Sequence, residues 1–237
     1  MSGIFKFKQF DVDQSGCAMK INTDGVLLGA LADADHPQTI LDIGTGTGVI
    51  ALMLAQRFTN TKIDAVEIDQ SAAETAGRNF QSSPFADRLA IFPSDFTGFF
   101  NQYSEKKYDL IVSNPPFYIN SLRSPEAKRD VAKHADRNFF TDLISYTSKH
   151  LTDKGVMFLI LPLDTVALVK EIAVKNRLFL KKKIMIYSYQ NSEPHREITA
   201  LSSNAGQATD ERFVIYESPK IYTKQYHETL KDFFTIF

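Results

Sequence analysis

The chain has 237 residues, of which 43% are apolar and 23% are charged, proportions typical of a globular protein with one α/β domain and a sizeable core. Cys17 is the single cysteine, which excludes an intrachain disulfide and a multi-cysteine zinc site. The net charge of −1 argues against a general nucleic-acid binder, and no apolar run is long enough to cross a membrane.

The N-terminus lacks the continuous apolar stretch of a signal peptide, so we expect a cytoplasmic protein. A segment of about 35 residues precedes the first strand–helix unit. It is expected to form a short extension of a single domain that spans residues 1–237. Within it, FKFKQF alternates aromatic and polar residues, which predicts a short strand or hairpin.

Strand-like and helix-like segments alternate through the middle of the chain. Apolar runs predict strands at residues 39–42, 62–67, 89–92, 109–113 and 155–161. Helical patterns lie at residues 49–58, 71–79, 139–150 and 163–175, and Ser71 is the expected cap of the second helix. This alternation predicts βαβ units and a mostly parallel sheet, and therefore an α/β fold.

The end of the chain changes character. Residues 183–189, 197–203 and 212–217 are strand-like, and no helix of normal length separates the last two. Short connections join antiparallel strands more readily than parallel ones. We therefore expect antiparallel strands at the C-terminal edge of the sheet.

A glycine-rich turn follows the first predicted strand, with glycines at 44, 46 and 48. The dinucleotide fingerprint G-x-G-x-x-G would need glycine at position 49, where Val49 stands, so the spacing opposes a nicotinamide dehydrogenase. Closely spaced glycines allow a backbone to turn sharply and approach a ligand, although a purely structural turn is the alternative.

Three carboxylates fall beside or at predicted strand ends: Asp42, Glu67 and Asp95. Ligands bind at the carboxyl ends of strands in an open parallel sheet, so these groups are expected to converge on one cleft. Glu67 is suited to accept hydrogen bonds from a ribose diol, and Asp95 from an adenine amino group. Each alone is also explained as a solvated acid or a helix cap.

The sequence Asn114-Pro115-Pro116-Phe117 follows the fourth predicted strand. Two prolines fix the backbone, remove two donors and leave carbonyl oxygens exposed, to which Asn114 adds an amide oxygen. Such a group of acceptors can hold both hydrogens of a planar amino group and direct its lone pair at an electrophile. Phe117 is placed to stack on a flat substrate. The alternative interpretation is that the motif forms a rigid turn without a binding role.

These motifs resemble those of class I S-adenosylmethionine-dependent methyltransferases. LDIGTGTGVIALMLA is similar to their first motif, VEID to their second, and NPPF after DLIVS to the motif of amino-group methyltransferases. The resemblance implies a Rossmann-like fold with a mostly parallel, seven-stranded sheet flanked by helices, and no metal. It also implies S-adenosylmethionine as cofactor, converted to S-adenosylhomocysteine. The implied cofactor contacts are Asp42, Gly44, Gly46, Glu67, Ile68, Asp95 and Phe96.

A closer resemblance is to the bacterial tRNA1(Val) adenine-37 N6-methyltransferases. It rests on FKFKQFDVDQSGCAMKINTDGVLLG before the first motif and on SLRSPEAKRDVAKHADRNFF after NPPF. It implies a monomer that docks a tRNA anticodon loop, with Thr23 and Asp24 over the cofactor. The phenylalanines of FKFKQF would then be either core residues, which is the favoured interpretation, or platforms for RNA bases. The sequence pI of about 6.5 is atypical of a tRNA enzyme.

A basic stretch follows the NPPF motif and is a candidate for phosphate contacts with RNA. Intervening acidic residues make a solvated helix face an equally good interpretation. The charge of the whole chain is also uneven, with a net of −5 over residues 1–120 and +4 over residues 121–237. The candidate residues are Arg123, Lys128, Arg129, Lys133, His134 and Arg137.

Several other activities stay open. Protein glutamine methyltransferases share an NPPY-type motif but carry a helical N-terminal domain, and only 38 residues precede the first predicted strand here. DNA adenine methyltransferases usually need a target-recognition region, for which the chain has little room. An rRNA adenine methyltransferase and a non-catalytic RNA-binding protein also remain, and the intact Asp42, Glu67 and Asn114 oppose the last.

Overall fold

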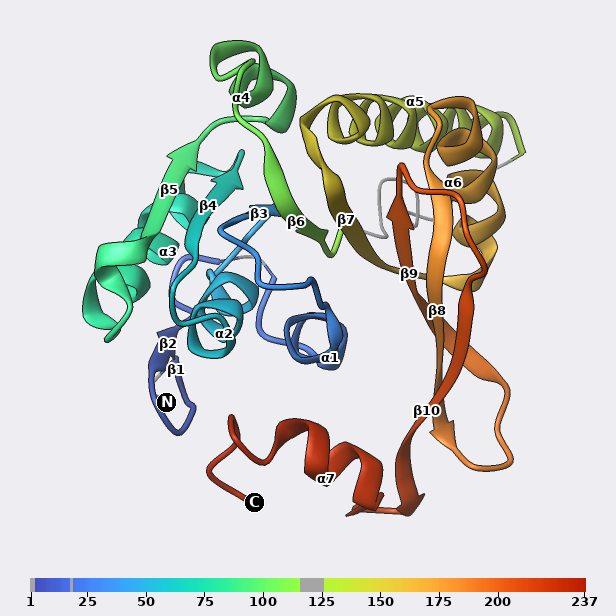
Figure 1. Ribbon diagram of the computed structural model, residues 1–237. Coiled ribbons are helices and arrows are strands. Elements are labelled where there is room, and N and C mark those ends of the chain that lie inside the picture. The colour runs from blue at the N-terminus through green and yellow to red at the C-terminus, as the bar shows by residue number, and fades with distance from the viewer. Residues whose placement is uncertain (1–2, 18, 116–125) are drawn as a thin grey trace.

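A computed structural model describes residues 3–17, 19–115 and 126–237, with side chains between 126 and 136 left undescribed. Nine strands form one sheet in the order β11-β10-β8-β9-β7-β6-β3-β4-β5, and a separate hairpin pairs β1 with β2 (Figure 1). The strands are β1 Ile4–Lys6, β2 Asp11–Asp13, β3 Thr39–Ile43, β4 Lys62–Glu67, β5 Leu89–Pro93, β6 Tyr108–Ser113, β7 Leu151–Leu161, β8 Phe179–Tyr189, β9 Pro194–Ser202, β10 Thr209–Ser218 and β11 Ile221–Tyr222.

The helices separate into two layers, one on each face of the sheet. Residues of α1, α2 and α3 join one buried cluster, and residues of α4, α5 and α6 join the other (Figure 1). The helices are α1 Thr23–Leu31, α2 Val49–Arg57, α3 Gln70–Ser82, α4 Phe96–Gln102, α5 Glu126–His150, α6 Leu163–Lys175 and α7 Lys224–Leu230, with a short 3-10 turn, η1, at Ala86–Arg88.

The alternation of side chains along each central strand supplies both cores. In β6, Leu110 and Val112 pack with the α1–α3 layer, while Ile111 between them packs with the α4–α6 layer. Successive strand side chains point to opposite faces, so a strand that is apolar at every position is buried on both sides. This explains the continuous apolar runs in the sequence.

The expected α/β fold and mostly parallel sheet are confirmed, and the sheet is larger than expected. The seven strands from β5 through β8 make up the anticipated sheet, in which β9 runs antiparallel to both β7 and β8. β10 then pairs in parallel with β8, and the short β11 pairs antiparallel with β10, which gives nine strands. The C-terminal edge is therefore mixed rather than antiparallel throughout.

Local capping differs from expectation at α3. Asp69 is the cap, because its Oδ1 accepts the Ala72 N–H at 2.8 Å. Ser71 instead donates its hydroxyl to the Gly16 carbonyl at 3.0 Å and ties the N-terminal segment to the helix. Among the residues that the structure describes, no helix is long and apolar enough to cross a membrane.

Candidate active site

The glycine turn between β3 and α2 adopts backbone angles that favour glycine and leave free space beside it. Gly44, Gly46 and Gly48 have φ angles of 73°, 57° and 83°, a region that favours glycine. The amides of Gly44 and Thr45 both donate to the Val66 carbonyl, at 2.8 and 3.1 Å. A Cβ at Gly44 or Gly46 would meet nothing within 4 Å, so the loop borders open space.

Asp42 lies beneath this turn and is completely buried. Its Oδ2 accepts the Thr45 hydroxyl at 2.6 Å, while its Oδ1 accepts no hydrogen bond from the described residues. Burial raises the pKa of this carboxyl to about 7, and the nearby charge of Glu67 adds to the rise. Asp42 does not line the adjoining cavity, so its place is beneath the loop rather than on the cavity wall.

Glu67, at the end of β4, is fixed from both sides. Its Oε2 accepts the Gly46 N–H at 2.8 Å and its Oε1 accepts the Asp69 N–H at 2.9 Å. Each carboxylate oxygen keeps acceptor capacity after one such bond. The side chain is nearly buried and lines the cavity, an arrangement suited to a diol.

Asp95 caps α4 at the end of β5. Its Oδ1 accepts from the Gly98 amide at 2.9 Å and from the Thr97 hydroxyl, and these bonds lower the pKa of the carboxyl, the Thr97 hydroxyl most strongly. Phe96 follows it and meets Phe139 of α5 edge to face, with ring centroids 5.7 Å apart. Asp95, Phe96 and the exposed Ile68 form a wall suited to a flat, partly polar ring.

These groups border a single cavity of about 390 Å³, a typical size for a small-molecule site. Because β3, β4, β5 and β6 run parallel, their carboxyl ends meet at one edge of the sheet, as the sequence predicts. Nine of the lining residues were not predicted from the sequence, among them Cys17, Met19 and Phe139. No periodic pattern marks the first two, and burial raises the pKa of the Cys17 thiol.

Asn114 and Pro115 form the opposite wall of the cavity, directly after β6. The Asn114 side-chain oxygen is buried and accepts no hydrogen bond from any described residue. A buried polar atom without a partner is rare in a folded protein and requires an explanation. Beside it, the Ser113 hydroxyl donates to the Ile43 carbonyl at 2.8 Å and locks the end of β6 to β3.

Several predicted site residues lie elsewhere or outside the described part of the chain. Thr23 and Asp24 do not line the cavity. Asp24 instead forms an ion pair with Arg196 of β9 at 2.8 Å. Pro116, Phe117 and Arg123 lie outside the described residues. The backbones of Lys128, Arg129, Lys133 and His134 belong to α5, and their side chains are not described.

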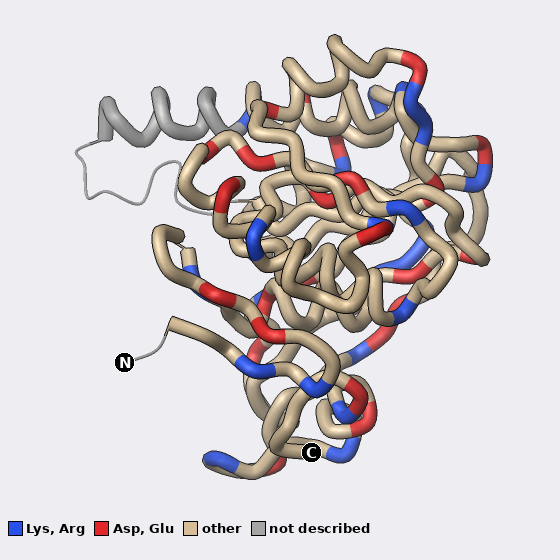
Figure 2. The backbone as a smooth tube through the Cα atoms, turned by 90° about the vertical axis from the view of Figure 1, so that its left-hand side faces the viewer, with Lys and Arg blue, Asp and Glu red and all other residues tan. Residues whose placement is uncertain are grey.

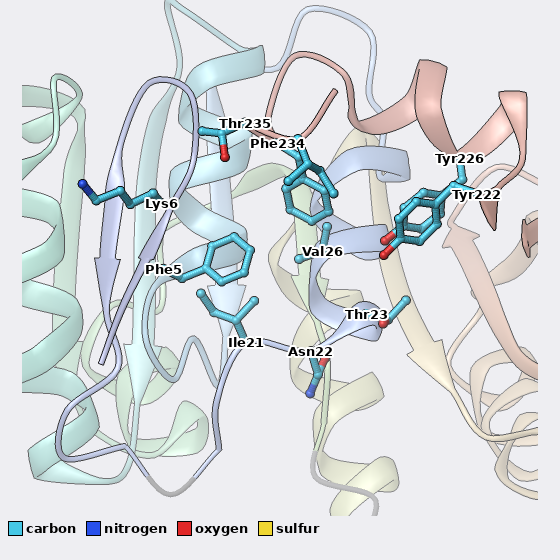
Figure 3. Close-up of a pocket in the computed structure, with 11 residues that line it drawn as sticks. Phe5, Lys6, Ile21, Asn22, Thr23, Val26, Tyr222, Tyr226, Phe234 and Thr235 are labelled. Carbon is cyan, nitrogen blue, oxygen red and sulfur yellow. The ribbon is translucent and has the colours of Figure 1, made fainter. Parts of the chain in front are cut away.

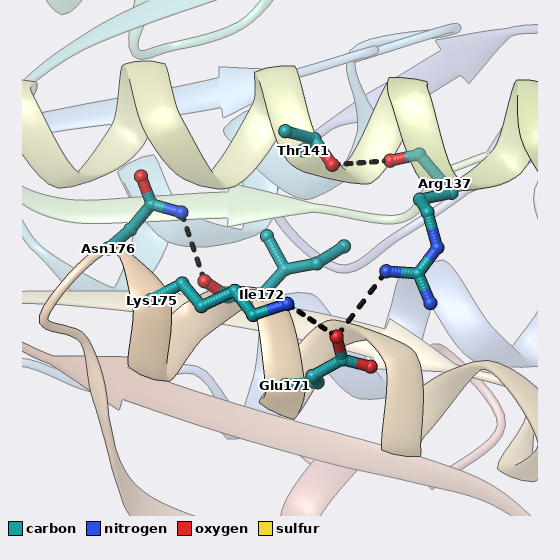
Figure 4. A network of polar contacts seen from close by, with 6 residues as sticks. All are labelled: Arg137, Thr141, Glu171, Ile172, Lys175 and Asn176. Atoms are coloured by element: carbon teal, nitrogen blue, oxygen red, sulfur yellow. Dashed lines mark hydrogen bonds and ion pairs between the residues drawn. The ribbon is translucent and has the colours of Figure 1, made fainter.

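Arg137 is the one member of the predicted basic stretch with a described side chain. Its Nη1 lies 3.4 Å from Glu171 Oε1 of α6, an oxygen that also contacts Lys175 Nζ at 2.7 Å (Figure 4). In this structure Arg137 therefore takes part in a surface ion-pair network within the protein. Elsewhere in the described ranges, no group of three or more His, Cys, Asp or Glu residues is placed to hold a metal ion.

The methyltransferase small domain family matches residues 20–165. Proteins named tRNA1(Val) (adenine(37)-N6)-methyltransferase are similar over nearly the whole chain: one from Pedobacter heparinus is 45% identical over 100% of both chains, one from Christiangramia forsetii is 41% identical over 97% of both, and one from Bacteroides fragilis is 36% identical over 97% of both.

Solved structures of methyltransferases share the fold. A predicted O-methyltransferase from Agrobacterium tumefaciens superposes with a TM-score of 0.70 at 18% identity, covering 89% of this chain and 96% of its own. A ribosomal protein L11 methylase from Lactobacillus delbrueckii gives a TM-score of 0.57 at 17% identity, covering 82% and 84%. At these identities, the likeness establishes the Rossmann-like methyltransferase architecture and nothing finer.

Proposed function

The chain belongs to the tRNA1(Val) (adenine(37)-N6)-methyltransferase family, within the methyltransferase small domain family, and we propose that it methylates N6 of adenosine 37 in tRNA1(Val). Its fold implies that S-adenosylmethionine is the methyl donor. One observation carries the assignment to an amino acceptor: Asn114, whose buried side-chain oxygen has no partner among the described residues, lines the same cavity as Glu67 and Asp95.

The cavity fits the methyl donor by its chemistry. Gly44 and Gly46 leave open space where any other residue would place a Cβ, and the Glu67 carboxylate is positioned for the ribose hydroxyls. Ile68 and Phe96 offer apolar surface to the adenine ring, and Asp95 offers an acceptor to its amino group. Bound there, S-adenosylmethionine supplies an electrophilic methyl group on a sulfonium.

The acceptor wall provides orientation rather than acid–base chemistry. Asn114 Oδ1 is positioned to accept an N–H of the substrate amino group, while Pro115 has no amide hydrogen to compete for that acceptor. Holding the N–H bonds favours a pyramidal nitrogen whose lone pair points across the cavity. The proton leaves N6 after the methyl group has transferred, so no charged general base is required, and fixed geometry supplies the rate gain.

The finer points of recognition belong to this proposal. The target adenosine leaves its stack in the anticodon loop, at a cost of a few kcal/mol, and enters beside Asn114. We include Pro116 and Phe117, which lie outside the described residues, in the proposed substrate-binding motif. We further propose that the protein acts as a monomer and works in the cytoplasm, where its tRNA substrate is found.

The decisive experiment offers the protein labelled S-adenosylmethionine together with separate pools of tRNA, rRNA, DNA and protein. We expect label in tRNA, recovered as N6-methyladenosine by nucleoside mass spectrometry and mapped to position 37 of tRNA1(Val). Label in protein glutamine, or in rRNA or DNA with none in tRNA, would contradict the proposal.

A further inference from the structure

A second cavity of about 360 Å³ lies between the N-terminal hairpin, α1 and the C-terminal segment; we call it the hairpin cavity (Figure 3). It is separate from the active-site cavity lined by Gly44, Glu67 and Asn114, and no step of the proposed reaction uses it. Its walls are mostly aromatic and aliphatic. The main lining side chains are Phe5, Ile21, Val26, Tyr222, Tyr226 and Phe234.

One wall carries a hydrogen-bonding edge. Tyr226 is only 4% exposed, and Tyr222 stacks on it with ring centroids 4.5 Å apart. Figure 3 shows both hydroxyls directed toward Thr23 and the interior of the cavity. The Tyr226 hydroxyl has no hydrogen bond to a described residue and is not among the fully buried unpaired atoms, so it is reached from the cavity. Burial raises the pKa of Tyr226, which keeps this hydroxyl protonated.

The opposite wall carries a flat apolar surface. Phe5 is half-buried, whereas Phe7 and Phe10 of the same segment are buried and stack on each other. Phe7 and Phe234 meet the Phe5 ring at 51° and 54°, so neither lies parallel to it. Phe5 and Ile21 line the cavity with apolar surface, and the hairpin phenylalanines thus divide between core and cavity.

The hairpin cavity lies next to the acceptor wall of the active site. Asn22 caps α1 through Gly25 and lines the hairpin cavity. A Cβ built on Gly25 would lie 3.6 Å from Asn22 Oδ1 and 3.7 Å from Asn114 Nδ2. The N-terminal turn of α1 thus lies close to both amide side chains, which places the cavity within a nucleotide's reach of the methyl acceptor.

The surroundings carry positive charge suited to a phosphate backbone. Lys6 lines the cavity, Lys20 precedes Ile21, and Lys224 starts α7 beside Tyr222. All three are exposed, and none forms an ion pair with another described residue. Figure 2 shows Lys and Arg segments along the N-terminal strand and beside the C-terminus, at the end of the molecule where both termini lie.

We propose that the hairpin cavity binds an unpaired base of the substrate RNA, from a nucleotide next to the methylated adenosine. The base stacks on Phe5 and Ile21, its polar edge meets the Tyr226 hydroxyl, and the lysines contact the adjoining phosphates. A largely apolar slot with polar groups along one edge and a cationic rim matches a nucleobase in a strand. The inference rests on the proposed function, because it takes the acceptor to be an RNA adenosine.

The test measures steady-state kinetics of the full chain on a tRNA1(Val) transcript with three variants. Phe5→Leu keeps apolar volume but removes the flat ring, and we expect its KM for tRNA to rise about tenfold. Tyr226→Phe removes only the hydroxyl, and a rise of about fivefold is expected. Ile236→Glu places a negative charge at a cavity residue that is 69% exposed, and so raises KM for tRNA without disturbing the core.

The controls distinguish loss of base binding from loss of the folded structure or of cofactor binding. Tyr189→Phe removes a tyrosine hydroxyl outside the cavity and leaves both KM values unchanged. In all three cavity variants, the KM for S-adenosylmethionine stays within about twofold of wild type. Thermal melting checks the fold, and if Phe5→Leu does not fold, the other two variants decide the question.

The two possible failures are distinguishable. If the wild-type chain labels the transcript and the folded variants keep the wild-type KM for tRNA, the base-binding site is wrong and the proposed function stands. If the wild-type chain does not label tRNA at all, the proposed function is wrong and the inference falls with it.

Discussion

The two walls of the active-site cavity are built differently. On the donor side, formed by residues 44–48, Glu67 and Asp95, polar groups are already occupied by bonds within the protein: Glu67 accepts two backbone amides and Asp95 caps a helix. On the acceptor side, the Asn114 oxygen is buried without a partner among the described residues.

The contrast shows how a site can bind one ligand and react with another. Internal hydrogen bonds fix the donor side before the cofactor arrives, so little ordering is needed on binding. An unpaired acceptor costs stability in the free protein, and in the proposed function a substrate N–H recovers this cost by filling it. Changes on the donor side should therefore affect cofactor affinity, and changes on the acceptor side should affect turnover.

The largest effect is expected on the acceptor side. Asn114→Ala should lower kcat about 1,000-fold, because it removes the oxygen that orients the amino group. Cofactor affinity, measured by calorimetry, should stay within about twofold. Asn204→Ala, on a loop where Asn204 Nδ2 donates to the Asp153 carbonyl, is the matched control. Retained turnover in Asn114→Ala would disprove the acceptor assignment.

A pH-dependent change of nearly the same size is expected in the unfolding equilibrium constant. It comes from Asp42, which lies beneath the donor side. Folding raises the pKa of Asp42 from 3.8 to about 7, so between these values the folded protein holds a proton that the unfolded chain has released. Rising pH then favours unfolding by up to about tenfold per pH unit, and the effect levels off above about pH 7.

Urea unfolding at a series of pH values measures this contribution. The stability of wild type relative to Asp42→Asn should fall as the pH rises from about 4 to 7, because the amide does not titrate there. A stability difference that is independent of pH would show that Asp42 titrates alike in the folded and unfolded chains.

Glu67→Ala tests the donor side directly. It removes a carboxylate that we assign to the ribose hydroxyls, and we expect the dissociation constant for S-adenosylmethionine to rise about 30-fold. Glu171→Ala, at an exposed glutamate of α6, should leave that constant unchanged. An unaltered constant in Glu67→Ala, measured by calorimetry, would refute the ribose role.

The smallest effect is expected at Gly44. A methyl group there would meet no protein atom, but it projects into open space beside the cavity from a residue with a φ of 73°. Gly44→Ala should weaken cofactor binding about tenfold with a modest loss in thermal stability. Gly206→Ala, also in open space but without a positive φ, should change neither. Equal affinities in the two variants would contradict cofactor approach to this turn.

The predicted elements that the structure confirms are those with strong periodic patterns. The sequence missed α1, whose residues Thr23–Leu31 include two glycines and a run of five buried positions. Such a helix shows no amphipathic stripe, because α2, α7 and the sheet pack around it. The parallel pairing of β10 with β8 was missed for a related reason, since a short connection does not reveal which strand a neighbour joins.

The candidate site shows the same difference between residues marked by a local pattern and residues brought in by distant segments. Gly44, Gly46, Glu67 and Asp95, which were predicted from the sequence, line the cavity because each follows or ends a strand, whereas Asp42 lies within β3 and does not line it. Phe139 and Cys17 were not found, because they reach the cavity from α5 and from the N-terminal segment. Thr23 and Asp24 were assigned to the cofactor by resemblance, whereas the structure turns Asp24 toward Arg196.

Neighbouring residues alone were enough to predict the α/β class, a mostly parallel central sheet and a site at the carboxyl ends of its strands, because local periodicity and strand ends depend on adjacent residues. Only the tertiary structure decided that Asp42 is buried under the loop, that the Asn114 oxygen lacks a partner, and that Phe5 faces a cavity while Phe7 joins the core. Burial and hydrogen-bond pairing depend on segments distant in sequence, and packing alone brings these together.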